Sequence, residues 1–293
     1  MKKVGVIIVI IALLISSFYL YEKFNSKEVS SEETVEKPYE NMLDNTITIY
    51  DIEEGYLTVK YNSLADRHEY NWDKYLDNSS SFYKYEDNKY KAKLGIDVSE
   101  YQGNIDWEKV KKSGIEFAII RIGYRGYGKN GNIVLDSKFE ENYKKAIENG
   151  IDVGVYFFSQ AINTDEVKEE IDFILKNIEG KEIKYPITFD LEKIKNDTAR
   201  TDNLTFEEIT NMTMEFCKII NNNGYIASIY GNSKTFTTKM KLDLFNDYNK
   251  WYADYQKKPL YPYEFNMWQY TETGHVDGID GNVDINICFV EKK

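Results

Sequence analysis

The sequence predicts an irregular α/β barrel that follows a small β-rich extension. From Lys93 onward, strand-like runs alternate with helix-like segments, which is the pattern of parallel strands covered by helices. In the last third of the chain the strand-like runs continue without helix-length segments between them. This loss of helices predicts an irregular barrel, and closure by antiparallel strands is one way to complete it. Three of the strands also carry an acidic residue opposite an apolar face.

Residues 185–192 form the strand on which the functional prediction depends. Apolar side chains alternate with polar ones, so that Thr188, Asp190 and Glu192 share one face. Residues two apart on a strand lie about 6.6 Å apart, and both carboxylates therefore point the same way. Most glycosidases use two acidic residues that flank the scissile bond as their catalytic residues. For an isolated stretch, an edge strand with a solvated acidic face is the alternative explanation.

Two further strands repeat this pattern. Asp97 lies opposite the apolar face of residues 94–99, and Asp284 and Asn286 lie opposite three β-branched residues in the run 283–287. In a barrel of parallel strands the apolar faces meet helices, and the acids gather at one mouth. The sequence therefore predicts a cluster of four acids, namely Asp97, Asp190, Glu192 and Asp284.

The elements of the barrel follow in chain order. The expected helices have recognisable ends, because glycine follows three of them and Thr205 begins a capping box with Glu208. The predicted strands cover residues 94–99, 117–123, 153–160, 185–192, 225–230, 250–255, 265–271 and 283–289. The predicted helices cover residues 106–114, 137–149, a segment that opens at Thr164, 205–224 and, with a weaker pattern, 233–241.

The chain before the barrel domain (residues 93–293) begins with an apolar run. Residues 1–3 include two lysines, and residues 4–21 contain no charge. This run is at the short end for a membrane-spanning helix and lacks a small-residue cleavage site. We therefore expect an uncleaved anchor with residues 1–3 in the cytoplasm and the barrel on the outer face of the cell membrane. A cleaved signal that leads to secretion is the alternative.

Residues 22–45 are charged, rich in acids and aperiodic, which is typical of a flexible stalk. Residues 46–92 are predicted to form the small β-rich extension. Within it, two strand-like runs (46–50 and 56–61) are separated by Glu53-Glu54-Gly55, so a hairpin is expected. No residue of the extension belongs to a recognisable chemical motif, and we expect it to pack on the barrel or to be tethered to it.

Composition narrows the classes of function. The chain has 37 Lys and Arg against 49 Asp and Glu, and its formal net charge of −12 argues against nucleic acid as a partner. The 25 tyrosines suit both packing and the apolar faces of sugars. Cys217 and Cys288 lie in apolar settings and are expected to be buried free thiols. With two histidines, a His-rich metal site is not expected; we expect a monomer without a metal or cofactor.

Aromatic residues near the strand ends extend the candidate site, because the C-terminal ends of the strands build the active site in barrels of this class. For any single aromatic residue, packing in the core is the alternative. Convergence of these residues with four acids favours a cleft for a sugar chain. The predicted substrate-binding residues besides Asp284 are Tyr124, Tyr156, Phe158, Tyr230, Trp251, Trp268 and Gln269.

A series of motifs resembles the glycoside hydrolase family 25 lysozymes. The first motif is residues 94–103 (LGIDVSEYQG), and the series covers roughly residues 93–289, which leaves residues 1–92 outside the resemblance. The later motifs, in the order of the family, are IDW (105–107), FAIIRIG (117–123), GVYFF (154–158), FDLE (189–192), WQY (268–270) and VDIN (283–286).

The resemblance implies an N-acetylmuramidase that cuts the β-1,4 bond between N-acetylmuramic acid and N-acetylglucosamine. Peptidoglycan glycan strands are therefore the expected partner. It also implies a flattened barrel with fewer than eight helices. The chain departs from the family at Phe157, where many members carry a histidine after the tyrosine.

By position in these motifs, Glu192 is the expected general acid/base, with a pKa raised by Asp190 and Asp97 nearby. Asp190 is expected to stay ionised and to orient the 2-acetamido group of the substrate, whose oxygen attacks the anomeric carbon. A direct role of Asp97 or Asp190 as nucleophile or base stays open. Asp97 and Asp284 are assigned to the floor of the pocket, and for Asp284 a structural role is an equal alternative.

Three other functions are compatible with parts of the pattern. A Mg²⁺ enzyme would use a similar cluster of carboxylates, because hard cations bind oxygen ligands. A sugar-binding module that has lost catalysis would not need to retain all four acids. A chitinase-like glycosidase shares the Asp-x-Glu pair, but the longer acidic signature of that group is absent from the sequence.

Overall fold

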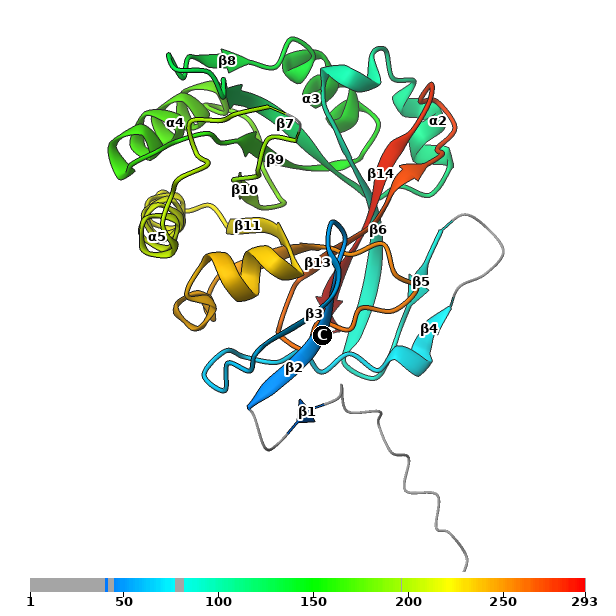
Figure 1. Cartoon of the computed structure of the whole chain (residues 1–293). Coiled ribbons are helices and arrows are strands. Elements are labelled where there is room, and N and C mark those ends of the chain that lie inside the picture. The colour runs from blue at the N-terminus through cyan, green and yellow to red at the C-terminus, as the bar shows by residue number, and fades with distance from the viewer. Residues whose placement is uncertain (1–39, 42–44, 77–81, 196, 293) are drawn as a thin grey trace, which may run out of the picture. The chain divides into compact units, whose positions relative to one another are not determined.

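The computed structural model describes residues 40–41, 45–76, 82–195 and 197–292 (Figure 1). The expected cytoplasmic residues 1–3, the expected membrane segment 4–21 and most of the expected stalk 22–45 lie outside the described residues. Among the residues that are described, no helix is both long enough and apolar enough to cross a membrane.

Eight strands close into a barrel, because β6 pairs with β7 as well as with β14. The order around the barrel is β6-β14-β13-β12-β11-β10-β9-β7, and β8 (Ile133–Leu135) extends β7 on the outside. The barrel strands are β6 (Tyr90–Val98), β7 (Phe117–Arg125), β9 (Asp152–Phe158), β10 (Ile187–Asp190), β11 (Ala227–Asn232), β12 (Asn249–Ala253), β13 (Met267–Gly274) and β14 (Val283–Glu291).

One strand of the barrel runs against all the others. The pairs from β6 through β7, β9, β10, β11 and β12 to β13 are parallel, whereas β14 is antiparallel to both β13 and β6. The prediction of an irregular barrel closed by antiparallel pairing is therefore confirmed. Because β14 is reversed, it begins at the mouth where the parallel strands end, and Asp284 near its start pairs with Asp97 near the end of β6.

Four α-helices accompany the first part of the barrel, namely α2 (Trp107–Lys112), α3 (Phe139–Glu148), α4 (Thr164–Asn177) and α5 (Phe206–Asn222). The capping box predicted at the start of α5 is present, since the Thr205 hydroxyl accepts from the Glu208 backbone at 3.2 Å. The expected helix at 233–241 is instead a π-helical turn, η3 (Thr235–Lys239), within a stretch rich in β-branched threonines that are poor helix formers. Among the described residues the barrel thus has fewer than eight helices, as predicted.

The interior of the barrel is closed at the end opposite the mouth. Phe117, Ile119, Trp251 and Met267 pack together inside it, separately from the larger core between the strands and the helices. Phe117 stacks on Tyr185 with ring centroids 4.3 Å apart. A Cβ atom on Gly95 would lie 2.2 Å from the Phe117 ring, so only glycine at this position allows the ring to fill the barrel.

The extension forms the predicted hairpin and packs on the barrel. Strands β2 (Thr46–Asp51) and β3 (Gly55–Lys60) pair in antiparallel register, and β1 (Glu40–Asn41) pairs with β2. A second small sheet joins β4 (Tyr75–Leu76) to β5 (Lys84–Tyr85). Aromatic residues then join the extension to the outer side of β13 and β14; for example, the ring centroids of Tyr70 and Phe289 are 3.9 Å apart.

Candidate active site

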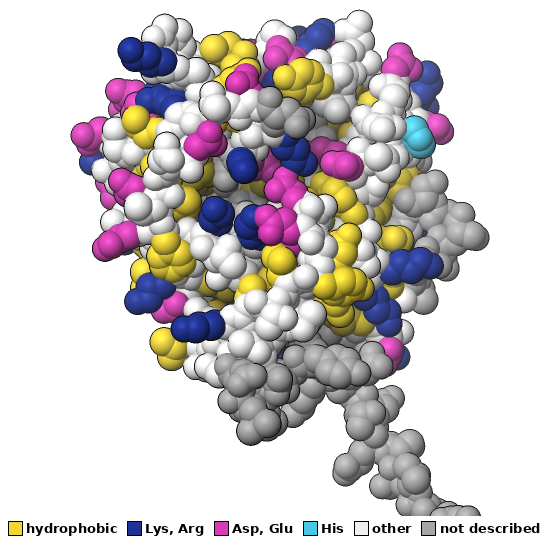
Figure 2. Space-filling model, in the orientation of Figure 1, with side chains coloured by type: hydrophobic (Ala, Val, Ile, Leu, Met, Phe, Trp, Pro, Cys, Tyr) yellow, Lys and Arg dark blue, Asp and Glu magenta, His cyan; other side chains and the backbone are white. Residues whose placement is uncertain are grey.

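A cavity of about 230 Å³ opens at the mouth of the barrel. Figure 2 shows a hollow in the face of the molecule, with acidic and basic side chains gathered around it. The cavity is lined by residues from all eight barrel strands and from the segments that follow β6 and β10. They are Asp97, Val98, Ser99, Tyr101, Gln102, Arg121, Tyr156, Phe158, Asp190, Glu192, Tyr230, Trp251, Gln269 and Asp284.

All four predicted acids line this cavity. Asp97 comes from β6 and Asp190 from the last position of β10, while Glu192 follows two residues later. Asp284 comes from β14 and is the direct cross-strand partner of Asp97. Cβ atoms of such opposed residues are typically about 4.5–5.5 Å apart, so the two carboxyls face one another.

Asp97 is held by two amides. Its Oδ1 accepts hydrogen bonds from Gln269 Nε2 at 2.9 Å and from Asn286 Nδ2 at 2.8 Å. Burial raises the pKa of Asp97, and these two hydrogen bonds oppose the rise because they stabilise the carboxylate. Burial and the adjacent Asp97 raise the pKa of Asp284 to about 9. We infer that Asp284 is protonated at neutral pH, when its proton can be donated to Asp97.

Glu192 stands at the rim of the cavity. It is an exposed residue, but the dense protein around its carboxyl raises its pKa to about 7, against the opposing effect of Lys195. Glu53, Asp97 and Glu272 contribute in the same direction as burial. The raised pKa predicted for Glu192 is therefore found, although desolvation of the carboxyl by the surrounding protein, and not a neighbouring acid, is its main cause.

The surroundings of Asp190 oppose its ionised form, which differs from the expectation that this residue stays ionised. Its side chain is buried, and burial together with the charges of Glu192 and Asp97 raises its pKa well above the usual range. Arg121 acts in the opposite direction but does not outweigh burial. Among the described residues, its Oδ1 is buried without a hydrogen-bond partner. This oxygen is therefore available to accept a hydrogen bond from a bound molecule.

The remaining predicted binding residues divide into two groups. Tyr156, Phe158, Tyr230, Trp251 and Gln269 line the cavity. Their contacts fix the wall: the Tyr230 hydroxyl donates to Gln269 Oε1 at 2.8 Å, and Trp251 Nε1 donates to Asn286 Oδ1 at 2.8 Å.

Tyr124 and Trp268 are not part of the cavity lining. Tyr124 is half-buried beside the cavity, where its ring lies 5.2 Å from the Arg121 guanidinium carbon. Trp268 is fully buried on the outer face of β13, and its Nε1 donates to the Asp254 carbonyl at 2.6 Å. Its predicted place in the sugar cleft is thus wrong, because side chains alternate along a strand and Gln269 already points inward. Trp268 packs instead against Trp72, Tyr75 and Tyr83 of the extension.

Arg121 is the charged cavity residue that the sequence prediction missed; Val98, Ser99, Tyr101 and Gln102 also line the cavity without having been predicted. Its Nε donates to Asp136 Oδ2 at 2.7 Å and its Nη2 to Glu100 Oε1 at 3.0 Å, so its guanidinium is fixed beside the acids. The exposed ring of Tyr101 lies 4.9 Å from the guanidinium carbon. Arg121 has the same inward parity on β7 as Phe117 and Ile119, and this alternation was the available signal.

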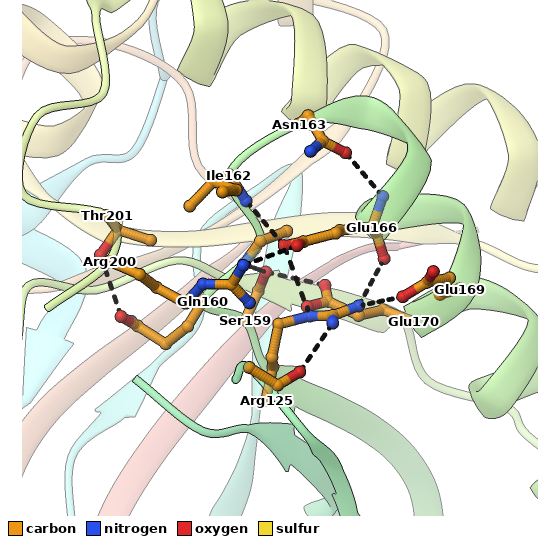
Figure 3. A network of polar contacts seen from close by, with 12 residues as sticks. Arg125, Ser159, Gln160, Ile162, Asn163, Glu166, Glu169, Glu170, Arg200 and Thr201 are labelled. Atoms are coloured by element: carbon orange, nitrogen blue, oxygen red, sulfur yellow. Dashed lines mark hydrogen bonds and ion pairs between the residues drawn. The ribbon is translucent and has the colours of Figure 1, made fainter. Parts of the chain in front are cut away.

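A polar network holds the segment that follows β10 (Figure 3). Gln160 Nε2 donates to the Glu192 carbonyl at 2.9 Å, and the Thr201 hydroxyl donates to Gln160 Oε1 at 2.9 Å. Arg200 Nη2 reaches Glu166 at 2.6 Å. The network thus connects α4 and the β9–α4 connection to both ends of the loop that carries Glu192, which limits the positions that the Glu192 backbone can adopt.

Deeper in the same network, a buried ion pair joins β7 to α4. Arg125 Nε donates to Glu170 Oε1 at 2.7 Å, and the Ser159 hydroxyl donates to Glu170 Oε2 at 2.7 Å. Arg125 also donates to the backbone carbonyls of Gly131 and Glu166. The carboxylate of Glu170 and the guanidinium of Arg125 are therefore both paired away from water.

Within the described part of the chain, no group of three or more His, Cys, Asp or Glu side chains is arranged to hold a metal ion. The chemistry that the cavity offers is proton transfer, hydrogen bonding and contact with aromatic rings. Its four carboxyls have their pKa values raised, and the arginine beside them supplies positive charge.

Comparison with known proteins places this barrel among glycosidases. The sequence profile described as glycosyl hydrolases family 25 matches residues 96–279. The chain is 28% identical over 202 residues to the uncharacterized protein YegX of Escherichia coli K12, with 66% of this chain and 68% of that protein covered. It is 26% identical over 196 residues to the autolytic lysozyme of Clostridium acetobutylicum, with 66% of this chain and 54% of that protein covered.

The fold is also similar to that of the modular autolysin LytC from Streptococcus pneumoniae. The TM-score is 0.60 at 23% sequence identity, and the match covers 84% of this chain. It covers 57% of the LytC chain, so more than a third of that protein has no counterpart here. LytC has also been solved in complex with a synthetic peptidoglycan ligand.

Proposed function

Because the chain belongs to the glycosyl hydrolases of family 25 and is a glycoside hydrolase of the lysozyme type, we propose that it cuts the β-1,4 bond between N-acetylmuramic acid and N-acetylglucosamine in peptidoglycan. The observation that supports this most strongly is the convergence of Asp97, Asp190, Glu192 and Asp284 on one cavity at the mouth of the barrel. Aromatic side chains in the same wall suit the apolar faces of sugar rings.

In the proposed reaction Glu192 is the general acid. A pKa of about 7 keeps much of its carboxyl protonated near neutral pH, so that it can donate to the leaving glycosidic oxygen. After departure of the first product, the same group as a carboxylate can accept a proton from the attacking water. Its place at the rim gives the leaving sugar and the water access to it.

Asp190 is proposed to act on the 2-acetamido group of the substrate. The buried Oδ1 without a partner can accept the N–H of that group, which orients the acetamido oxygen toward the anomeric carbon. The bond from the anomeric carbon to this oxygen then forms as the bond to the leaving oxygen breaks. Loss of the Asp190 proton to a neighbouring acceptor would strengthen this interaction.

Asp97 and Asp284 are proposed to complete the floor of the site. The pair is held by Gln269 and Asn286, and Asp97 contributes negative charge beside the position of the developing positive charge on the sugar. A direct nucleophilic role of Asp97 is the alternative to substrate assistance, and the two mechanisms differ in whether a covalent intermediate forms.

Substitution of Asp190 by asparagine is expected to cause a large loss of activity, because Asp190 is the proposed partner of the 2-acetamido group. The amide keeps the shape of the side chain but cannot become a carboxylate, so the acetamido group is no longer polarised. We expect loss of peptidoglycan turnover with retention of the fold, measured by release of reducing ends and by circular dichroism. Mass spectrometry of the native enzyme during turnover provides the second test. A covalent sugar ester on Asp190 or Asp97 would exclude the substrate-assisted mechanism.

The function itself is tested by incubating the purified protein with peptidoglycan and identifying the new reducing ends. Muramic acid at these ends supports a muramidase, whereas glucosamine ends or no release contradict the proposal. Chitin as a parallel substrate tests the chitinase-like alternative. Binding of glycan without cleavage would identify a sugar-binding module.

We further propose that residues 4–21 hold the protein at the cell membrane with the barrel on the outer side, where the wall lies. The uncharged run and the two lysines before it support this placement. N-terminal sequencing of the mature protein tests it. An intact N-terminus in the membrane fraction is the expected result, whereas a start between about residues 18 and 30 would mean cleavage and secretion.

A further inference from the structure

The turn of the β2–β3 hairpin meets the barrel beside the candidate active site, although the family profile begins only at residue 96. In Figure 1 the hairpin, drawn in blue, lies in the lower part of the view, and its turn points up toward the middle of the barrel. Its inward-facing residues Ile47 and Ile49 are fully buried. The hairpin is therefore docked as a structured part of the enzyme and is not a loose appendage.

Asp51 fixes the turn to the mouth of the barrel. One of its oxygens, Oδ1, accepts from the backbone N–H groups of Glu53 at 3.0 Å and Glu54 at 3.1 Å, which shapes the turn. The other, Oδ2, accepts from the Lys234 backbone at 2.9 Å, just after the end of β11. Asp51 is fully buried, so these bonds are protected from water.

The two glutamates that Asp51 positions make different ion pairs. Glu54 pairs with Lys234, on the barrel segment to which the turn is docked. Glu53 pairs with Lys195 at 3.2 Å, and Lys195 lies three residues after Glu192 in the loop that follows β10. The extension thus forms an ion pair with the loop that carries the proposed acid.

We propose that the β2–β3 turn is a functional part of the active site, in which Glu53 is a positioning residue that holds Lys195 and offsets its charge beside Glu192. This inference rests on the proposed role of Glu192 as general acid. It assigns a function to the extension, which carries no chemical motif of its own.

The charges around Glu192 decide in which direction its pKa changes when Glu53 is removed. The charged groups around it are Asp97, Asp190 and Asp284 in the cavity, Arg121 on β7, Glu272 on β13, Lys195 in its own loop and Glu53 from the extension. Tyr230 and Tyr255 also face it, and both are neutral at working pH because burial raises their pKa. Lys195 favours the charged form of Glu192 and Glu53 favours the protonated form. Removing Glu53 therefore lowers the pKa of Glu192.

The test compares Glu53→Gln with wild type in the full chain, with kcat/KM for peptidoglycan measured against pH. Because Glu192 must be protonated to act, activity is lost as pH rises through its pKa. For Glu53→Gln we expect this alkaline limb to move to lower pH by about half a unit at low salt. Well below the limb, where Glu192 is protonated in both proteins, the two should work at the same rate.

Glu54→Gln is the matched control, because it removes the same charge from the same turn but from the pair with Lys234. Its limb should coincide with that of wild type. Raising the salt from about 0.01 M to about 1 M shortens the Debye length from about 30 Å to about 3 Å, so the shift in Glu53→Gln should shrink. Lys195→Met should move the limb in the opposite direction, to higher pH.

Two results would overturn the inference. One is a limb of Glu53→Gln that coincides with wild type at low salt, and the other is an equal shift in Glu54→Gln. Thermal melts of each variant separate these outcomes from unfolding. If the wild-type protein does not cut peptidoglycan at any pH, the proposed function fails; if it cuts but the limb does not move, only the role of Glu53 fails.

Discussion

Replacing Glu192 with glutamine is expected to lower peptidoglycan turnover by about 10²–10⁴-fold, the usual contribution of a general acid/base. The amide occupies the same space at the rim of the cavity but cannot donate a proton as an acid. The fold and the affinity for glycan should persist, because the one hydrogen bond that the described residues make to Glu192 is to its backbone carbonyl, which the substitution keeps. Release of reducing ends measures the rate, and sedimentation with insoluble peptidoglycan measures binding.

Glu272→Gln serves as the control for this experiment, since Glu272 is an exposed acid of β13 whose charge acts on Glu192 without lining the cavity. It should retain most of the activity. If Glu192→Gln works within a factor of about 3 of wild type, another residue must supply the proton. In wild type, activity should fall as pH rises through about 7, where Glu192 loses its proton; in Glu192→Gln the residual rate should not follow this limb.

Replacing Arg125 with methionine is expected to lower the free energy of unfolding by about 3–5 kcal/mol, which is the typical cost of leaving one partner of a buried ion pair alone. The side chains of Arg125 and Glu170 are 4% and 0% exposed, so water cannot replace the lost partner. Two backbone carbonyls that accept from Arg125 would also lose their donor. Urea denaturation followed by tryptophan fluorescence measures the loss.

The control is Lys112→Met, which breaks an exposed pair with Glu108 on α2 and should change stability little. The double variant Arg125→Met/Glu170→Gln should recover part of the loss, because no charge is then left buried without a partner. A loss below about 1 kcal/mol in Arg125→Met would mean that Glu170 is protonated or solvated when its partner is absent.

The alternation of apolar and polar residues along single strands predicted most of the fold and the four acids. It works because a barrel strand has one face toward the helices and one toward the interior, so parity decides which side chains meet. The same rule, applied strictly to β13 and β7, would have excluded Trp268 and included Arg121. These two errors came from choosing residues by type, acids and aromatics, instead of by the face on which they lie.

Other features could not be predicted from any local sequence pattern. The network of Arg125, Gln160 and Arg200 joins segments that are far apart in sequence, and its residues resemble ordinary surface residues until the fold brings them together. The contact of Glu53 with Lys195 depends likewise on where the hairpin docks. The raised pKa of Asp190 depends on burial, which opposes the ionised state expected from the role assigned to that residue.

The aromatic plug made by Phe117 over Gly95 has a consequence for how a polymer can be cut. Since the interior is filled at that end, the barrel has no through-passage, and a glycan strand cannot be threaded along its axis. A glycan strand that binds as proposed must instead lie across the mouth of the barrel. Binding across the mouth requires no free chain end, so a bond in the middle of a long strand is as accessible as one near its terminus. Both fragments then leave from the mouth of the barrel, where the strand bound.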